Sequence, residues 1–280
     1  MNMFKNAEQV GKLMKEAISA GPKGMQAIAA AINGILEDYV DERAIVPEIL
    51  TLDNTNGENP EYSVVEDGKA YFIAENSKPI EDPTEGALVR PSILRLHSNP
   101  TMDIGVFERG QVGKMNERIA NAGLAMVKEE NSYVTTLLSA ALTALGATNT
   151  VNVAGGSLTM DALDSAIAFV EDNGLRVKSI LTRGQHLSSF SASDSPNFSD
   201  AQALRGAVKT YHGATVYNVP QMAADQVILI PDKQIGWAPV RSKMKTKASS
   251  TGFQMDILSW KEVGYALTLA KYSAQVTITP

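Results

Sequence analysis

Cysteine is absent from the sequence, which excludes a disulfide framework, a thiolate zinc site and a cysteine nucleophile. Long apolar runs are also missing, since none approaches the roughly 18 residues that a membrane-spanning helix needs. The N-terminal stretch 1–21 carries scattered lysines and no apolar central region, so we expect no secretion signal and a cytoplasmic site of synthesis. Excess positive charge is missing as well. The net charge is −6, so the molecule as a whole is not a polycation that seeks nucleic acid.

Histidine is scarce, with only three residues, His97, His186 and His212. None has a second histidine or a carboxylate at the spacing of metal ligands, so we expect neither a metal site nor a cofactor. Residue types of a catalytic triad occur around His186 and Ser188. They lie in one polar loop, however, without the strand-turn-helix elbow of a hydrolase nucleophile. We expect a solvated loop and no enzyme, and an α+β hydrolase that uses His186 and Ser188 stays open as an alternative.

One exceptionally long helical pattern covers residues 111–145. Apolar residues recur every three or four positions, from Val112 and Met115 to Leu145, and no proline interrupts them. About 35 residues at about 1.5 Å each would form a rod on the order of 50 Å long. Gly123 costs roughly 1 kcal/mol relative to alanine inside a helix, so we expect a bend or a close packing contact there. A single apolar stripe of this length needs a long, flat partner, and a β-sheet supplies one.

An acidic segment without helical periodicity precedes this helix. Residues 48–85 hold ten acidic residues against two lysines. Within it, 62–65 and 69–74 flank the turn Glu66-Asp67-Gly68, which predicts a β-hairpin. A two-stranded hairpin is marginal in water by itself, and this segment has few large apolar residues. It is therefore either without fixed structure or stabilised by lying on another surface.

The rest of the chain predicts a mixture of helices and strands. Helices are expected at 9–20, 25–40, 160–172, 185–190 and 200–208. Strands are expected at 101–110, 150–153, 177–182, 214–219, 226–230, 254–260, 263–270 and 274–279. The last three strands predict a long antiparallel C-terminal sheet that packs against the long helix, so the expected fold class is α+β.

A row of basic residues at every second position stands out near the C-terminal strands, namely Arg241, Lys243, Lys245 and Lys247. In a strand this spacing places all four side chains on one face. One interpretation is a solvated sheet edge that lysines protect from aggregation. The other is a patch that meets phosphate or an acidic neighbour.

The order of these parts resembles that of tailed-bacteriophage major capsid proteins with the Hong Kong 97-like fold. FERGQVGKMNERIANAGLAMVKEENSYVTTLLSAAL is similar to the spine helix of that fold, and SLTMDALDSAIAFVEDNGLRVKSILTRGQHLSSF to its second helix and the strand that enters the axial domain. YHGATVYNVPQMAADQVILIPDK resembles a strand-turn-strand passage of the axial domain, and 254–279 the sheet of the peripheral domain.

The resemblance implies a spine helix on an antiparallel sheet, a projecting hairpin loop (the E-loop) and a small α/β axial domain. The domains would be an N-terminal arm (1–47), the acidic hairpin loop (48–100), a peripheral domain (101–176 with 245–280) and an axial domain (177–244). We expect the arm to be short, without the long scaffolding extension that some relatives have ahead of the loop. A separate scaffolding protein, or none, is therefore expected.

The function that the resemblance implies is structural. Identical subunits would assemble through hexamers and pentamers into an icosahedral shell in the host cytoplasm, enclosing viral double-stranded DNA in the virion. Scaffolding, portal and decoration proteins would be further partners, and no membrane is involved. An encapsulin-type nanocompartment, which encloses cargo protein with the same fold, is the alternative.

Charge segregation along the chain suggests which residues join subunits. We expect the acidic loop to dock on a basic surface of a neighbour. The candidate contact residues are Glu58, Glu61, Glu66, Asp67, Arg90, Arg95, Arg109, Lys114, Arg118, Arg241, Lys243, Lys245 and Lys247. The candidate DNA-facing residues of the arm are Lys5, Lys12, Lys15 and Lys23, and Lys69 is a candidate for covalent crosslinking.

Overall fold

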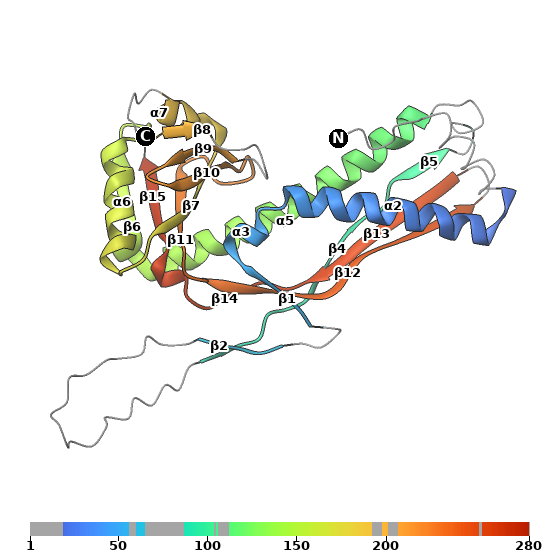
Figure 1. The fold of residues 1–280 in the computed structure, drawn as a ribbon, viewed down its shortest axis with the longest axis horizontal. Coiled ribbons are helices and arrows are strands. Elements are labelled where there is room, and N and C mark those ends of the chain that lie inside the picture. Colours follow the sequence, from blue (N-terminus) through green and yellow to red (C-terminus); the bar gives the residue numbers. More distant parts are fainter. Residues whose placement is uncertain are drawn as a thin grey trace, which may run out of the picture.

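The computed structural model describes residues 19–55, 60–64, 87–103, 105, 112–191, 198–200, 207–251 and 254–279. These residues form an α+β fold in which a 6-stranded and a 7-stranded sheet lie toward opposite ends of one long helix, α5 (Figure 1). None of the helices in the described ranges is both long and apolar enough to cross a membrane.

Helix α5 runs from Val112 to Leu145 and confirms the predicted long helix. A short 3-10 turn, η1 (Gly146–Asn149), follows it. The first half of α5 packs in one core through Ile119 and Met126, and the second half packs in another core through Val134 and Leu138. The two halves of the helix therefore face two different partners. The predicted apolar stripe is wrong near its end, because Leu145 is 40% exposed and the second half buries Val134, Leu138 and Leu142 instead.

Helix α2 (Pro22–Arg43) lies beside the first half of α5 (Figure 1) and is longer at both ends than the predicted 25–40. Pro22 fits the start of α2 because the N–H that it lacks has no partner in the first turn. At the contact with α5, a Cβ added to Gly123 would lie 2.8 Å from Cδ1 of Tyr39. The predicted close packing at Gly123 is thus confirmed.

A short helix, α3 (Val46–Ile49), follows α2. The backbone N–H of Ile45 donates to Oδ1 of the buried Asn131 of α5 at 2.9 Å. This bond satisfies a backbone donor where the chain turns from α2 to α3, so Asn131 fixes the turn against the long helix.

The 6-stranded sheet carries α2 and α5 on one face. Its strands are β1 (Thr51–Asn54), β12 (Gly236–Thr251), β13 (Gln254–Val263) and β4 (Leu94–Ser98) in this order, with β14 (Ala266–Leu267) on β12 and β5 (Thr101–Asp103) on β13. Most neighbours are antiparallel, as predicted, but β1 pairs with β12 in parallel. The predicted strand 263–270 is shorter, and the 3-10 turn η3 (Ala270–Tyr272) follows β14.

The 7-stranded sheet is mixed. Its order is β6 (Thr150–Ala154), β15 (Ala274–Thr279), β11 (Gln226–Pro231), β7 (Val177–Thr182), β10 (Ala214–Asn218), β9 (Ala207–Tyr211) and β8 (Phe198–Asp200). Alternate residues of β11 face two cores: Val227 packs in the core with helix α6 (Met160–Asp172), and Ile228 in the core with the second half of α5.

Two predictions are corrected by this sheet. The strand 274–279 was expected in the antiparallel C-terminal sheet, but β15 pairs with β11 and β6 instead. Its alternation of apolar and polar residues suits either sheet, so only long-range pairing decides. The helix expected at 200–208 is also wrong at its ends, because β8 ends at Asp200 and β9 begins at Ala207.

A buried ion pair ties α5 to β13. Nζ of Lys261 lies 2.5 Å from Oε2 of Glu130, and the Tyr265 hydroxyl donates to the other carboxylate oxygen at 2.9 Å. The Glu130 side chain is 2% exposed and the Lys261 side chain 13%. Burial, and then the nearby negative charge of Glu130, raises the pKa of Tyr265. The tyrosine therefore stays protonated and keeps donating to the carboxylate.

Gly236 lies where β12 meets β14, and we expect Gly236→Ala to destabilise the subunit. An added Cβ would lie 2.2 Å from the backbone oxygen of Ala266 and 2.8 Å from Cδ2 of Leu50. Because the nearer obstacle is backbone, the strands must separate, at a cost of about 1–3 kcal/mol. Urea denaturation measures this. Gly34→Ala in α2 is the control: it has open space and should gain up to about 1 kcal/mol. Equal stabilities would contradict the prediction.

Candidate subunit-contact surfaces

Two short strands form the base of a hairpin beside the 6-stranded sheet. Strands β2 (Tyr62–Ser63) and β3 (Leu88–Val89) pair antiparallel, and the N–H of Val64 donates to the carbonyl of Ala87 at 2.8 Å. Figure 1 shows this base outside the body of the subunit, beyond β1 and β14. We call the residues 60–64 and 87–90 the hairpin base.

The hairpin base differs in its pairing from the prediction. The described partner of Tyr62–Ser63 is Leu88–Val89, much farther along the chain than the predicted 69–74. The predicted second strand lies outside the described residues, and so do the candidates Glu58, Glu66, Asp67 and Lys69.

Tyr62 connects the hairpin base to the sheet. Its ring stacks on that of Trp237 in β12, with centroids 5.3 Å apart and planes 11° from parallel. Its hydroxyl donates to Oδ2 of Asp53 in β1 at 2.7 Å. Burial, and then the hydrogen bond to the Asp53 carboxylate, raises the pKa of Tyr62, so the phenol remains a donor. Tyr62 is 8% exposed, whereas Leu88 is 63% exposed.

An ion pair also occurs at the hairpin base, but it joins the two sides of the base to each other. The guanidinium of Arg90 lies 2.5 Å from Oε1 of Glu61. Their side chains are 74% and 40% exposed, so this pair contributes little to stability. Two of the predicted contact residues are therefore already paired within the subunit.

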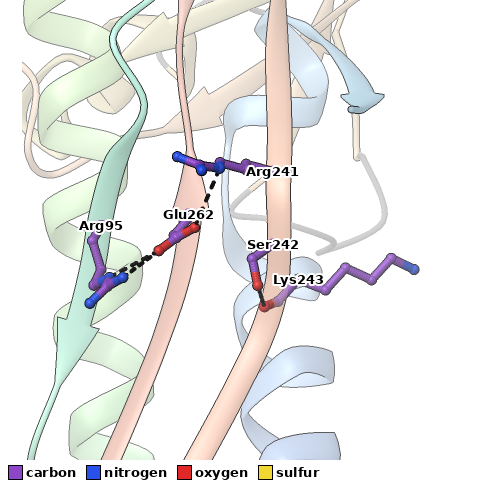
Figure 2. Close-up of polar contacts among 5 residues, drawn as sticks. All are labelled: Arg95, Arg241, Ser242, Lys243 and Glu262. Atoms are coloured by element: carbon purple, nitrogen blue, oxygen red, sulfur yellow. Dashed lines mark hydrogen bonds and ion pairs between the residues drawn. The ribbon is translucent and has the colours of Figure 1, made fainter. Parts of the chain in front are cut away.

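The predicted basic row on β12 is interrupted. Two register shifts between Val240 and Lys245 put extra residues into β12 relative to β13. Figure 2 shows the consequence: the Arg241 side chain reaches toward Glu262, and that of Lys243 points the opposite way. The prediction that all four residues share one face is wrong, because β-bulges break the two-residue period.

Arg95 and Arg241 share one carboxylate partner on β13. Two nitrogens of Arg95 donate to Oε1 of Glu262, at 3.1 and 2.6 Å, and Nε of Arg241 lies 4.0 Å from Oε2 (Figure 2). The hydrogen bonds from Arg95 lower the pKa of Glu262. The carboxylate therefore stays charged at neutral pH and lies within ion-pair distance of both arginines.

Lys245 and Lys247 are exposed and lie along a groove between α2 and β12. The groove has a volume of about 860 Å³, and Met25, Ala29 and Trp260 also line it. Beyond Val240, β12 has no strand on this edge among the described residues. Lys243 instead lines a separate cavity of about 180 Å³, which Glu37 and Asp41 share.

The remaining basic candidates have varied surroundings. Arg118 donates to the backbone carbonyl of Thr101 in β5, so it tethers α5 to the sheet. Lys114 on α5 and Lys23 on α2 are exposed. Arg109 and the arm residues Lys5, Lys12 and Lys15 lie outside the described residues.

His186, the histidine of the alternative hydrolase prediction, is a buried residue. His186, in the 3-10 turn η2 (Gly184–His186), is 4% exposed, and its Nε2 lies 2.7 Å from the backbone oxygen of Ala224. Helix α7 (Leu187–Ser191) follows, and the side chain of Ser188 is outside the described atoms. His186 joins two loops through this contact, in which Nε2 is the donor to the carbonyl oxygen. Within the described ranges no group of three or more histidine and acidic side chains could hold a metal ion.

Sequence reasoning did not detect the link between Tyr62, Asp53 and Trp237. No local signal could have revealed the stack, since 175 positions separate Tyr62 from Trp237 in the chain. The parallel pairing of β1 with β12, which brings Asp53 beside Pro239, is equally remote in sequence.

Comparison with known proteins shows which class of fold this is. No family model matches the chain, and no curated protein sequence matches it. Among solved structures, the virus-like particle from Pyrococcus furiosus is 12% identical with a TM-score of 0.60, covering 89% of this chain and 99% of that one. The structure of Mycobacterium phage Bobi gives 12% identity and a TM-score of 0.59, covering 85% and 91%.

A further similar structure contains the major capsid and decoration proteins of phage G. It is 8% identical with a TM-score of 0.54, and the match covers 85% of this chain and 90% of that one. The long helix, the two sheets and the match over most of each chain define the Hong Kong 97-like capsid fold. The chain has this fold, as its order of elements predicted.

Proposed function

We propose that this chain is a shell-forming structural protein, the major capsid protein of a tailed bacteriophage. Copies would join as hexamers and pentamers into an icosahedral shell that encloses double-stranded DNA. The observation that carries the proposal is the capsid fold over 85–89% of the chain. Repeated contacts between identical subunits can close into rings and then into a shell. Portal, scaffolding and decoration proteins would be partners, and the phage G structure with its decoration proteins supports the last of these.

We further propose how the fold divides into domains. The 6-stranded sheet with α2 and the first half of α5 would be the peripheral domain, and the 7-stranded sheet with α6 the axial domain. The hairpin, from 55 to 93, would be the E-loop. This division moves residues 150–176 and 274–279 from the peripheral to the axial domain, because β6, α6 and β15 pack with the 7-stranded sheet.

The contact that would join neighbouring copies is between the acidic hairpin and a basic surface. Arg90, Arg95 and Arg241 already have acidic partners within the subunit, so they are less available to bind the hairpin of a neighbour. Lys245 and Lys247 are exposed beside the groove, so we propose that they bind the acidic hairpin of a neighbour. Charge complementarity of this kind guides encounter and register more than it adds affinity. Lys23 and the lysines of the arm would face the packaged DNA.

The test is the size and shape of the purified protein. We expect size-exclusion chromatography and negative-stain electron microscopy to show closed, uniform particles. Many contacts, each modest in area, act together in such a shell. A monodisperse single subunit at high concentration would contradict the proposal.

An encapsulin-type nanocompartment is the second candidate, and the similarity to the Pyrococcus furiosus particle favours it. It shares the proposed shell but differs in its contents. Nuclease-protected DNA in particles isolated from the source organism would support the phage capsid. A co-purifying enzyme without DNA would support the nanocompartment.

A further inference from the structure

The hairpin base has few means of holding its own orientation. Each of its two strands has two residues, and a two-stranded ribbon is marginal without a surface to pack on. The ion pair of Glu61 with Arg90 joins the two sides of the base to each other and not to the body. On its C-terminal side the base continues into residues 91–93, which belong to no helix or strand.

Tyr62 attaches the hairpin base to the 6-stranded sheet. Its ring lies on Trp237, and its hydroxyl is bound to Asp53. Both partners belong to well-supported strands, since Trp237 pairs with Thr51 of β1 and with Ala266 of β14, and Asp53 pairs with Pro239. A stacked ring fixes the distance and plane of the base, and the hydroxyl at the far end of the ring fixes its rotation. We call Tyr62, Trp237 and Asp53 the hairpin latch.

Orientation at the base is amplified with distance. Residues 65 to 86 lie between the two halves of the base in the sequence, and half of a chain of that length can reach at most about 40 Å. A tilt of about 10° at the base would displace a point at that reach by about 7 Å. Contacts between subunits tolerate far less than this, so the direction of the hairpin must be set before it meets a neighbour.

We infer that the hairpin latch is a positioning element for assembly, in which Tyr62 fixes the direction of the hairpin in the free subunit. This inference rests on the proposed function, because it assumes that the hairpin contacts a second copy. The latch lowers the cost of association, because the hairpin base is already oriented when a neighbour binds. Tyr62 is thus a positioning residue, whose ring and hydroxyl contact Trp237 and Asp53 of its own chain.

A distance measurement on the free subunit tests the positioning directly. The chain has no cysteine, so Leu88→Cys on β3 and Ser249→Cys on β12, both at exposed positions, would carry the only two spin labels. Pulsed electron resonance on unassembled full-length protein should give one narrow distance distribution. Tyr62→Ala should widen it at least twofold, and Tyr62→Phe, which keeps the stack, should widen it less. An unchanged width in Tyr62→Ala would overturn the inference.

Assembly of the same variants provides the second measurement. We expect Tyr62→Ala to raise the concentration needed for particle formation at least tenfold, and Tyr62→Phe to raise it a few-fold. The control is Tyr211→Phe in the 7-stranded sheet, where the hydroxyl likewise donates to a carboxylate, Asp164, at 2.6 Å. It should not change assembly. A widened distribution with unchanged assembly would overturn the inference, as would an equal effect of Tyr211→Phe.

The two proposals fail in different ways. If the unmodified protein forms no particles, the proposed shell function fails, while the distance measurement still reports whether Tyr62 orients the hairpin base. If particles form equally well with Tyr62→Ala, the shell function stands and the latch is not a positioning element. Circular dichroism of each variant confirms that the body of the subunit is folded.

Discussion

A subunit that lacks residues 65–86 is expected to fold but to form no particles. Val64 and Ala87 face each other across the hairpin through an N–H···O bond of 2.8 Å. An Asn-Gly pair can therefore close the strands in a two-residue turn. The latch and the body remain, while the acidic part of the hairpin is gone. A loss of only about 2.7 kcal/mol per contact would raise the concentration needed for assembly about 100-fold. Negative-stain microscopy and light scattering measure this.

A charge variant separates the acidic character of the hairpin from its length. Glu66→Gln with Asp67→Asn keeps every residue but removes two charges. We expect assembly to become slower and less sensitive to salt, because charged side chains mainly guide encounter. Normal particles from the shortened subunit would contradict the role proposed for the hairpin, whatever the charge variant does.

Glu130→Ala is expected to lower the free energy of unfolding by about 3–5 kcal/mol. Breaking a buried ion pair from one side leaves the other charge without a partner. Here the remaining ammonium would be that of Lys261, whose side chain is 13% exposed. The Tyr265 hydroxyl would lose its acceptor as well. Urea denaturation of the unassembled subunit measures the loss, and the Tm should fall by on the order of 10 °C.

Two control variants test whether the loss of stability comes from the unpaired buried charge. Glu129→Ala changes the preceding, exposed residue of α5 and should alter stability by less than about 0.5 kcal/mol. Glu130→Met combined with Lys261→Met removes both charges and should restore most of the stability. A loss below about 1 kcal/mol in Glu130→Ala would mean that water or another carboxylate takes over the role of Glu130.

Local sequence patterns predicted the elements whose secondary structure does not depend on which other element they pack against. The long helix was expected at 111–145 and runs from Val112 to Leu145, because a three-four spacing without proline specifies a helix whatever lies beneath it. Strand β7 was expected at 177–182 and is found there. The close contact at Gly123 followed from the cost of glycine inside a helix.

Pairing partners and sheet membership were beyond such patterns. Strand β15 has the same alternation in either sheet, and its membership depends on the main-chain bonds to β11 and β6. The prediction of a basic row on one face of β12 failed because two bulges turn Lys243 away from Arg241. No pattern in the sequence indicates these bulges. The latch needs Tyr62 and Trp237 to meet across most of the chain, and no periodicity encodes that meeting.

The span of α5 has a mechanical consequence. Its first half shares a core with the 6-stranded sheet, and its second half shares another core with both sheets. Because both halves of α5 are packed in this way, the helix resists bending of the two sheets relative to each other. If copies of this chain form the proposed shell, its curvature would have to change at the contacts between subunits and not within them.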